Sequence, residues 1–253
     1  MRQKLFKRSL EHQHAEDTKY HLFHDPHRQA SGLSDIILGG QDGLVNVLGV
    51  ILGVAAATND PRIVLVAGLA ATFAESVSMG AVAYTSTLAD SDFYESERAR
   101  EFRHITAVPH LEKNEVREIY ARKGFKGELL EHIVETITAN EDVWVAVMMR
   151  EEHQLSPTDR TQAFKSALVV GFSAIVGSLI PLAPFAFLPV VHSMWVAVVI
   201  TAMVLFGVGA YKARKTVGHP GKSGLEMAVI GTLSALVGYA VGMLFKVPPA
   251  SIT

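Results

Sequence analysis

The chain has 253 residues, of which 49% are hydrophobic and 19% charged, with a formal net charge of -2 and no cysteine. The lack of a basic excess argues against a nucleic-acid-binding protein, and the lack of cysteine excludes disulfides and thiolate metal sites. The mean hydropathy of +0.25 averages two unlike parts, because residues 1–30 and 90–160 are densely charged and the rest is apolar. Such segregation is typical of membrane spans joined to a solvated part.

The N-terminal arm, residues 1–31, is rich in histidine: His12, His14, His21, His24 and His27. A His-rich tract can bind metal, but these histidines lack a regular helical spacing. We therefore expect a flexible cytoplasmic arm, with no apolar run of the kind found in a cleavable signal peptide.

Five segments have the roughly 20 mostly apolar residues that a membrane-spanning helix needs. They are Leu33–Thr58, Ile63–Leu88, Ala163–Leu188, Val190–Tyr211 and Leu225–Phe245. The sequence thus predicts an all-α membrane protein with five transmembrane helices per subunit. We expect helices 1 and 2 within residues 32–89, a charged insert at 90–161, and helices 3–5 within 162–253.

Turn residues separate some of these spans. The motif "NDPR", residues 59–62, favours a tight turn between the first two spans. The motif "PLAPFAFLP" contains Pro181, Pro184 and Pro189, which predict a kink or an end in the third span.

Lysine and arginine concentrate in the arm, in the insert, and in the link between the fourth and fifth spans. The loop between the first and second spans and the loop between the third and fourth contain one basic residue, Arg62. By the positive-inside rule the N-terminus and the insert are cytoplasmic and the C-terminus is outside. We expect the plasma (inner) membrane of a prokaryote, or the vacuolar membrane in a eukaryotic cell.

The insert is predicted to be helical, with its first helix continuing from the second span to near Pro109 and a second helix ending at Gly124. One or two more helices precede the motif "SPTDR". A core-facing stripe is formed there by Leu129, Leu130, Ile133, Val134 and Ile137. We expect a cytoplasmic three-helix domain.

The first span contains an acid, in "LGGQDGLVNVLGVILG". An Asp at the bilayer centre costs about 2.5–3.5 kcal/mol on insertion scales, and Asp42 is too deep in the span to be explained as a helix-end residue. On a helix, Asp42, Asn46, Gly49 and Gly53 lie near one face, and the glycine pair allows close approach of another helix. We expect a helix–helix seam, with Asp42 and Asn46 on a polar path.

The second span places Glu75 and Met79 at i and i+4, hence on one face. A Met in an apolar helix is usually core filler, but this one lies a turn from an acid. Carboxylate oxygen with thioether sulfur suits ferrous iron better than Ca²⁺ or Mg²⁺. Since carboxylates also bind protons, metal and proton can compete for a path formed by Asp42, Asn46, Glu75 and Met79.

The insert repeats these ligand types in "EFRH", "EKNEVRE" and "MMREEH". Glu101 and His104 form the i, i+3 pair of carboxylate-bridged metal bundles. Each motif alone is typical of a solvated helix face, but together they predict a metal-binding domain. The candidate ligands are Glu101, His104, Glu112, Glu115, Met148, Met149 and Glu152.

From Ser34 onward the chain resembles the vacuolar iron transporter family of ferrous iron/proton exchangers, and we expect it to be a prokaryotic member. The resemblance is carried by "SDIILGGQDGLVNVLGVILG", "SMGAVAYTS", "ITAVPHLEKNEV", "AVMMREEH" and "GSLIPLAPF". It implies five transmembrane helices per subunit, a homodimer, and a cytoplasmic metal-binding domain of three helices.

The resemblance also implies roles for single residues. Asp42 and Met79 would line the translocation path near the dimer axis. The implied metal ligands of the insert are Glu101, Glu112, Glu115, Met148, Met149 and Glu152. Two positions depart from the plant members, which have Glu in place of His104 and of Ala71. Glu75 lies one turn closer to Met79 than Ala71 does, and we expect it to substitute for the missing Glu at position 71.

We therefore expect an Fe²⁺/proton antiporter that moves metal out of the cytoplasm, without enzymatic activity or a tightly bound cofactor. An exporter of Mn²⁺, Co²⁺ or Zn²⁺ with the same fold is an alternative, because oxygen–sulfur sites rank these ions only loosely. A membrane-tethered di-iron oxidase or iron-storage module is another, although such sites need two Glu-x-x-His motifs and the insert has one. A purely structural membrane protein would leave Asp42 and Glu75 without a role.

Overall fold

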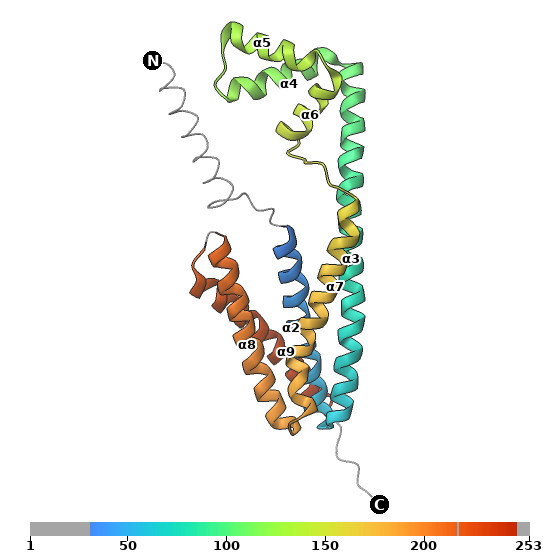
Figure 1. Ribbon diagram of the computed structural model, residues 1–253, viewed down its shortest axis with the longest axis vertical. Coiled ribbons are helices and arrows are strands. Elements are labelled where there is room, and N and C mark those ends of the chain that lie inside the picture. Colours follow the sequence, from blue (N-terminus) through green and yellow to red (C-terminus); the bar gives the residue numbers. More distant parts are fainter. Residues whose placement is uncertain (1–30, 217, 247–253) are drawn as a thin grey trace, which may run out of the picture. The chain divides into compact units, whose positions relative to one another are not determined.

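The computed structural model describes residues 31–216 and 218–246, and every regular element in that part is a helix (Figure 1). The elements are α2 (Ser31–Thr58), α3 (Pro61–Ala107), α4 (Pro109–Arg122), α5 (Gly127–Thr138), α6 (Glu141–Glu151), α7 (Thr161–Leu182), the 3-10 helix η2 (Ala183–Ala186), α8 (Val190–Lys215) and α9 (Pro220–Leu244). The His-rich arm and its five histidines lie outside the described residues.

Five helical segments are long and apolar enough to cross a membrane: α2, α3, α7 with η2, α8 and α9. The predicted all-α fold with five candidate membrane spans is thus confirmed. Helices α3, α8 and α9 extend past the predicted apolar segments, and α3 continues to Ala107. The side of the membrane on which each loop lies stays a prediction.

The turn between α2 and α3 follows the predicted chemistry. Asn59 adopts a left-handed backbone conformation with φ of 51°. The Asp60 carboxylate then caps α3 by accepting a hydrogen bond from the Arg62 N–H at 2.8 Å, and Pro61 occupies the first helical turn. Proline fits there because that turn's N–H groups have no partner within the helix.

The third span ends where its prolines predict. Pro181 lies in the last turn of α7, and the chain continues as η2 before α8 begins. The single hydroxyl hydrogen of Ser193 in α8 is shared between the Pro184 carbonyl at 3.1 Å and the Leu188 carbonyl at 3.0 Å. These bonds satisfy carbonyl groups in a segment where helical pairing is interrupted.

Helix α2 packs closely against its neighbours because glycine faces backbone along it. A Cβ added at Gly49 would meet Ser234 of α9, and one added at Gly53 would meet the Gly238 carbonyl. At its other end, a Cβ at Gly43 would meet the Ala174 carbonyl of α7. The predicted seam at Gly49 and Gly53 is therefore confirmed, with α9 as the partner helix.

Helices α4, α5 and α6 pack together, and α4 and α6 also pack against α3. An apolar cluster holds them, including Ile105 of α3 and Val134 of α5. Gly124 follows α4 with φ of +100°, as expected for a helix C-cap. The predicted stripe on α5 is right for its buried residues, but Leu129 is 57% exposed, because it lies about 100° around the helix from Leu130.

Helix α3 is a single helix of 47 residues that links the bundle of spans to the insert. Its contacts with α7 are extensive along the spans, and α4 and α6 pack on it in the insert. The same helix therefore carries Glu75 among the spans and Glu101 in the insert.

Candidate metal sites

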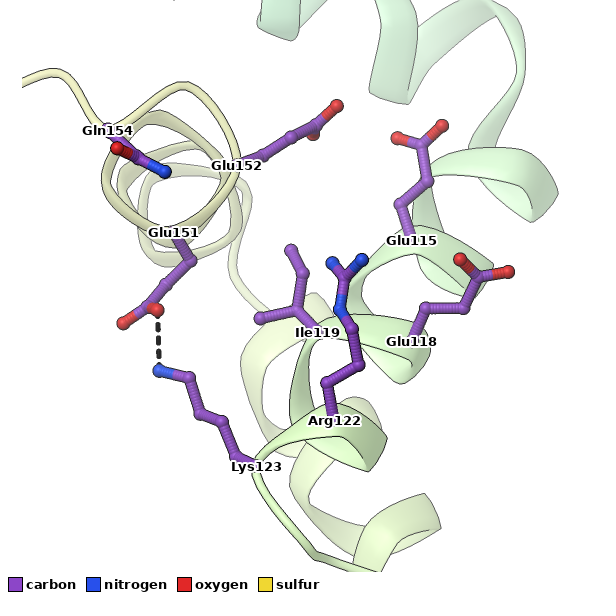
Figure 2. Close-up of a pocket in the computed structure, with 8 residues that line it drawn as sticks. All are labelled: Glu115, Glu118, Ile119, Arg122, Lys123, Glu151, Glu152 and Gln154. Carbon is purple, nitrogen blue, oxygen red and sulfur yellow. Dashed lines mark hydrogen bonds and ion pairs between the residues drawn. The ribbon is translucent and has the colours of Figure 1, made fainter.

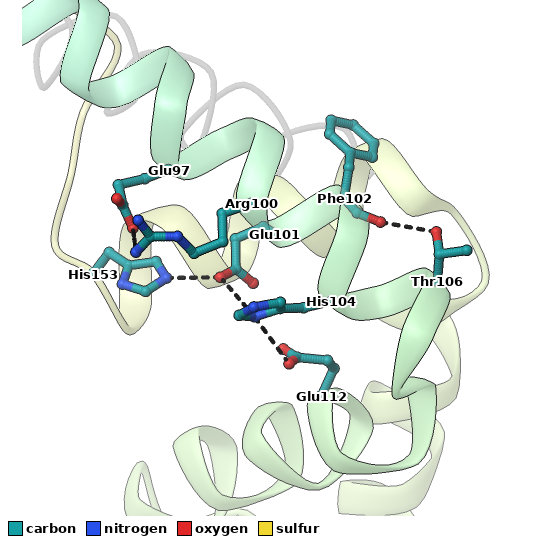
Figure 3. A network of polar contacts seen from close by, with 8 residues as sticks. All are labelled: Glu97, Arg100, Glu101, Phe102, His104, Thr106, Glu112 and His153. Carbon is teal, nitrogen blue, oxygen red and sulfur yellow. Dashed lines mark hydrogen bonds and ion pairs between the residues drawn. The ribbon is translucent and has the colours of Figure 1, made fainter.

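Three predicted ligands of the insert come together where α3 meets α4. One ligand atom from each of Glu101, His104 and Glu112 lies within 4.8 Å of the others. The His104 Nδ1 atom is 3.5 Å from Glu112 Oε1 and 3.9 Å from Glu101 Oε1 (Figure 3). Two carboxylates and one imidazole suit a borderline divalent transition metal.

The local sequence explains this arrangement. Pro109 disfavours the helical conformation of the residue before it, so α3 ends and Val108 adopts φ of -136° and ψ of 53°. Helix α4 starts at once, with Pro109 in its first turn. The last turn of α3 therefore lies beside the first turn of α4, and Glu112 meets His104.

The site carries more negative charge than its own side chains neutralise. Glu101 and Glu112 are only 3% and 5% exposed. Burial, together with the neighbouring charges of Glu115, Glu101 and Glu152, raises the pKa of Glu112 to about 7. The Glu101 Oε2 atom is buried without a hydrogen-bond partner among the described residues. A bound cation would satisfy both features.

Glu115 and Glu152 form an acidic extension of this site. Both line an open pocket of about 690 Å³ between α4 and the end of α6, and their carboxylates point into the space between the two helices (Figure 2). Burial and the charge of Glu115 raise the pKa of Glu152, partly offset by His153. These two predicted ligands thus lie in the same electrostatic network as the triad.

Met148 and Met149 take a different position. Their side chains are 0% and 1% exposed, and both belong to the apolar cluster of the insert with Ile105 and Val116. In this arrangement they pack the core beneath the acidic residues. Their role as metal ligands stays a prediction.

One further residue contacts the triad without having been in the predicted ligand set: the His153 Nε2 atom lies 2.9 Å from Glu101 Oε1. Glu97, one turn before Glu101, is 7% exposed and is paired with Arg100 at 2.9 Å. Burial opposes a charge on His153, but the hydrogen bond and charge of Glu101 raise its pKa overall. The spacing of Glu97 and Glu101 at i, i+4 is the signal that predicts a shared face.

A second acidic site lies among the spans. Glu75 of α3 is 8% exposed, with Asp42 and Asn46 of α2 as polar neighbours. Both of its carboxylate oxygens are nevertheless buried and lack a hydrogen-bond partner in the part of the chain that the structure describes. Met79, one turn along α3, is half-buried.

Asp42 and Asn46 differ from Glu75 in their exposure. Both side chains are exposed on the surface of the single chain, although they lie within a candidate membrane span. The structure thus places Asp42, Asn46 and Glu75 at one junction of α2 and α3, with two polar side chains open to the outside.

Comparison with known proteins covers both sites. Residues 33–243 match the model of the VIT family. The chain belongs to the VIT family. It is 33% identical over 222 residues to vacuolar iron transporter 1 of Oryza sativa subsp. japonica, covering 86% of this chain and 88% of the relative. It is 34% identical over 208 residues to vacuolar iron transporter 1 of Eucalyptus grandis, covering 82% and 84%.

Relatives of this chain are also found outside plants. The vacuolar iron transporter of Plasmodium falciparum is 30% identical over 224 residues, covering 85% of this chain and 82% of the relative. The family match contains both the Asp42–Glu75 junction and the Glu101 triad. Family membership therefore agrees with the resemblance inferred from the sequence motifs.

Proposed function

We propose that this VIT family member is a divalent metal/proton antiporter that moves Fe²⁺ out of the cytoplasm for detoxification or homeostasis. The names of its relatives support iron as the cargo. The observation that carries the proposal is the buried Glu75 carboxylate, which has no hydrogen-bond partner among the described residues and lies beside Asp42 and Asn46. A buried carboxylate needs a proton or a cation to neutralise it, and an antiporter site exchanges the two.

The junction of α2 and α3 supplies suitable chemistry. Asp42 and Glu75 together balance the charge of one dication, and Asn46 adds a neutral oxygen. The Met79 thioether, one turn from Glu75, gives softer character that favours a transition metal over Mg²⁺. When protons enter from the opposite side they take the same carboxylate oxygens, and the metal is released.

A homodimer explains the exposure of Asp42. A carboxylate facing lipid near the bilayer centre is unfavourable by about 2.5–3.5 kcal/mol on insertion scales. A second copy of the chain packed over α2 and α3 would cover Asp42 and Asn46 and enclose a shared path. Two Asp42 carboxylates near a common axis would repel one another, which raises their affinity for a dication and for protons.

In this mechanism the insert collects the ion before it enters the membrane. The positive-inside rule assigns the insert to the cytoplasm, which is the entry side for export. Glu101, His104 and Glu112 form the core of the collecting site, and Glu115 and Glu152 extend it toward the open pocket. The sulfur atoms of Met148 and Met149, which are buried in α6, would bind the ion only after local repacking.

Transport into proteoliposomes tests the proposal. We expect Fe²⁺ flux driven by a pH gradient, and we expect Asp42→Ala to lose it. Glu128→Ala is the matched control, because Glu128 is an exposed acid on α5. If Asp42→Ala carries iron as fast as the unmodified protein, the path through this junction is wrong.

A transporter of the same fold with another cargo is the second candidate. His104 puts a nitrogen ligand in the triad, and nitrogen suits Co²⁺ and Zn²⁺ as well as Fe²⁺. Competition of Mn²⁺, Co²⁺ and Zn²⁺ against Fe²⁺ flux separates the cases. Stronger competition by one of these ions than by unlabelled Fe²⁺ would identify that ion as the preferred cargo.

A further inference from the structure

His153 contacts the triad from outside, through one oxygen of one ligand. Its Nε2 atom lies 2.9 Å from Glu101 Oε1, and the imidazole reaches this oxygen from the side opposite His104 (Figure 3). The other Glu101 oxygen, Oε2, is buried and has no hydrogen-bond partner within residues 31–216 and 218–246. The two oxygens of this carboxylate therefore have different surroundings.

The backbone at the end of α6 fixes the position of His153. Its N–H donates to the Met148 carbonyl at 3.2 Å, and the Leu155 N–H donates to the Met149 carbonyl at 2.9 Å. Between them Gln154 adopts φ of 56°, which turns the chain away from the helix. Because the two methionines are buried in the apolar cluster, the imidazole is held by a well-packed part of the insert.

We propose that His153 is a positioning residue of the metal site, which donates its Nε2–H to Glu101 Oε1 and so fixes the orientation of the carboxylate that binds the ion shared with His104 and Glu112. This inference rests on the metal-collecting role proposed for the insert. Ligating carboxylates are commonly held by such hydrogen bonds, and loss of the outer partner typically lowers metal affinity about 10–100-fold. His153 thus contributes to affinity without touching the ion.

Direct ligation by His153 is a distinguishable alternative. A ligand nitrogen must be unprotonated and must point at the metal, whereas Nε2 of His153 points at Glu101 Oε1. A glutamine amide can donate the same hydrogen bond as the Nε2–H of histidine but is a poor substitute for an imidazole ligand. His153→Gln therefore separates the two roles.

The experiment titrates the purified full-length protein with Co²⁺, and follows binding by calorimetry and by the visible absorption bands that report cobalt coordination. Glu101→Gln defines the signal of the triad, and any binding by the N-terminal histidines is common to all variants and cancels in the difference. The variants are His153→Ala and His153→Gln, and His132→Ala is the matched control because His132 is exposed on α5. Thermal unfolding without metal checks that each variant is folded.

We expect His153→Ala to weaken the triad's Co²⁺ affinity about 10–100-fold and to leave the position of the absorption bands unchanged. His153→Gln should restore most of the affinity. Unchanged affinity in a folded His153→Ala overturns the inference while leaving the metal site intact. A loss in both variants with altered cobalt bands also overturns it, in favour of direct ligation. If Glu101→Gln binds Co²⁺ as well as the unmodified protein, the metal site itself fails, and the role of His153 fails with it.

Discussion

The bundle of spans and the insert both hold acidic residues, but they surround them differently. In the insert, Glu101 has histidine neighbours on either side and the acids lie above an apolar cluster of one chain. Among the spans, Glu75 has buried oxygens without partners in the described residues, and Asp42 is open to the outside. The acids of the insert thus face histidines of the same chain, whereas at the junction of α2 and α3 one acid is buried without a partner among the described residues and the other is open to the outside.

The two regions also differ in the size of the side chains through which their helices pack. The spans approach through glycine, as at Gly49 and Gly238, where no side chain separates the backbones. The insert packs through larger side chains such as Val134 and Met148, both 0% exposed. Between helices surrounded by lipid there is no hydrophobic driving force, so close backbone contact favours their association. In a region surrounded by water, the burial of apolar side chains drives packing.

The largest expected effect separates transport from binding. Glu75→Gln keeps the side-chain size but removes the charge, so we expect proton-driven Fe²⁺ flux to fall to the level of empty liposomes. Ion binding by the insert should be unchanged in this variant. Glu101→Gln should do the opposite, with weaker binding and flux that recovers at saturating Fe²⁺. Equal loss of flux in both variants at saturating ion would contradict the division of labour between the two regions.

The next effect concerns the backbone contacts of the bundle. A Cβ at position 238 would collide with the backbone of Gly49, so Gly238→Ala should lower the free energy of unfolding by about 1–3 kcal/mol, as overpacking does in a tight core. Gly207→Ala is the matched control, because nothing lies within 4 Å of its added Cβ. Denaturation in detergent measures both, and a stable Gly238→Ala would show that α2 and α9 separate easily.

The pH dependence of ion binding sharpens the description of the insert. Burial and neighbouring acids raise the pKa of Glu112 from its usual 4.5 to about 7, so this group binds a proton below pH 7 that a metal ion must displace. Affinity should therefore fall about tenfold between pH 8 and pH 6, since one pKa unit corresponds to a factor of ten. Metal titrations at several pH values measure this slope.

Glu112→Gln is the control for the pH experiment. It should bind more weakly at pH 8 and lose the part of the slope that comes from this residue. A slope that survives unchanged in Glu112→Gln would assign the proton to another group of the site. The same substitution should leave transport at saturating ion unaffected.

The sequence predicted the parts of the structure that depend on local chemistry. Apolar length identified the five candidate spans, and Pro61 and Pro181 marked ends of helices. The i, i+3 spacing of Glu101 and His104 predicted a shared face, and Pro109 brings Glu112 beside it. These features depend on residues close in the chain, where helical geometry leaves few choices.

The remaining features depend on contacts between distant segments. Helical spacing did not reveal that Met148 and Met149 face the core, because an apolar sulfur residue suits a core and a metal site equally well. It also did not reveal that His153 reaches Glu101, 52 residues earlier in the chain. The packing of the whole insert decides which helix faces meet, and residue spacing within one helix does not predict such contacts between helices.

The smallest expected effect tests whether surface charge matters in the insert. Arg117 of α4 donates hydrogen bonds from its Nε and Nη2 atoms to Glu131 of α5 at 2.8 and 2.9 Å, and these bonds hold the pKa of Glu131 below its usual range. The stability that the pair adds is therefore present above the usual carboxylate pKa and is lost as the pH falls through the lowered value.

Because both side chains of this pair remain open to water, Glu131→Gln should change the unfolding midpoint at pH 7 hardly more than Glu128→Gln, an exposed acid on the same helix. Circular dichroism melts of the two variants measure the difference. A clear loss of stability in Glu131→Gln alone would show that ion pairs between helices, and not only the apolar cluster around Val134, hold the insert together. That result would change the contrast with the bundle, because the insert would then depend on ion pairs as well as on the burial of apolar side chains.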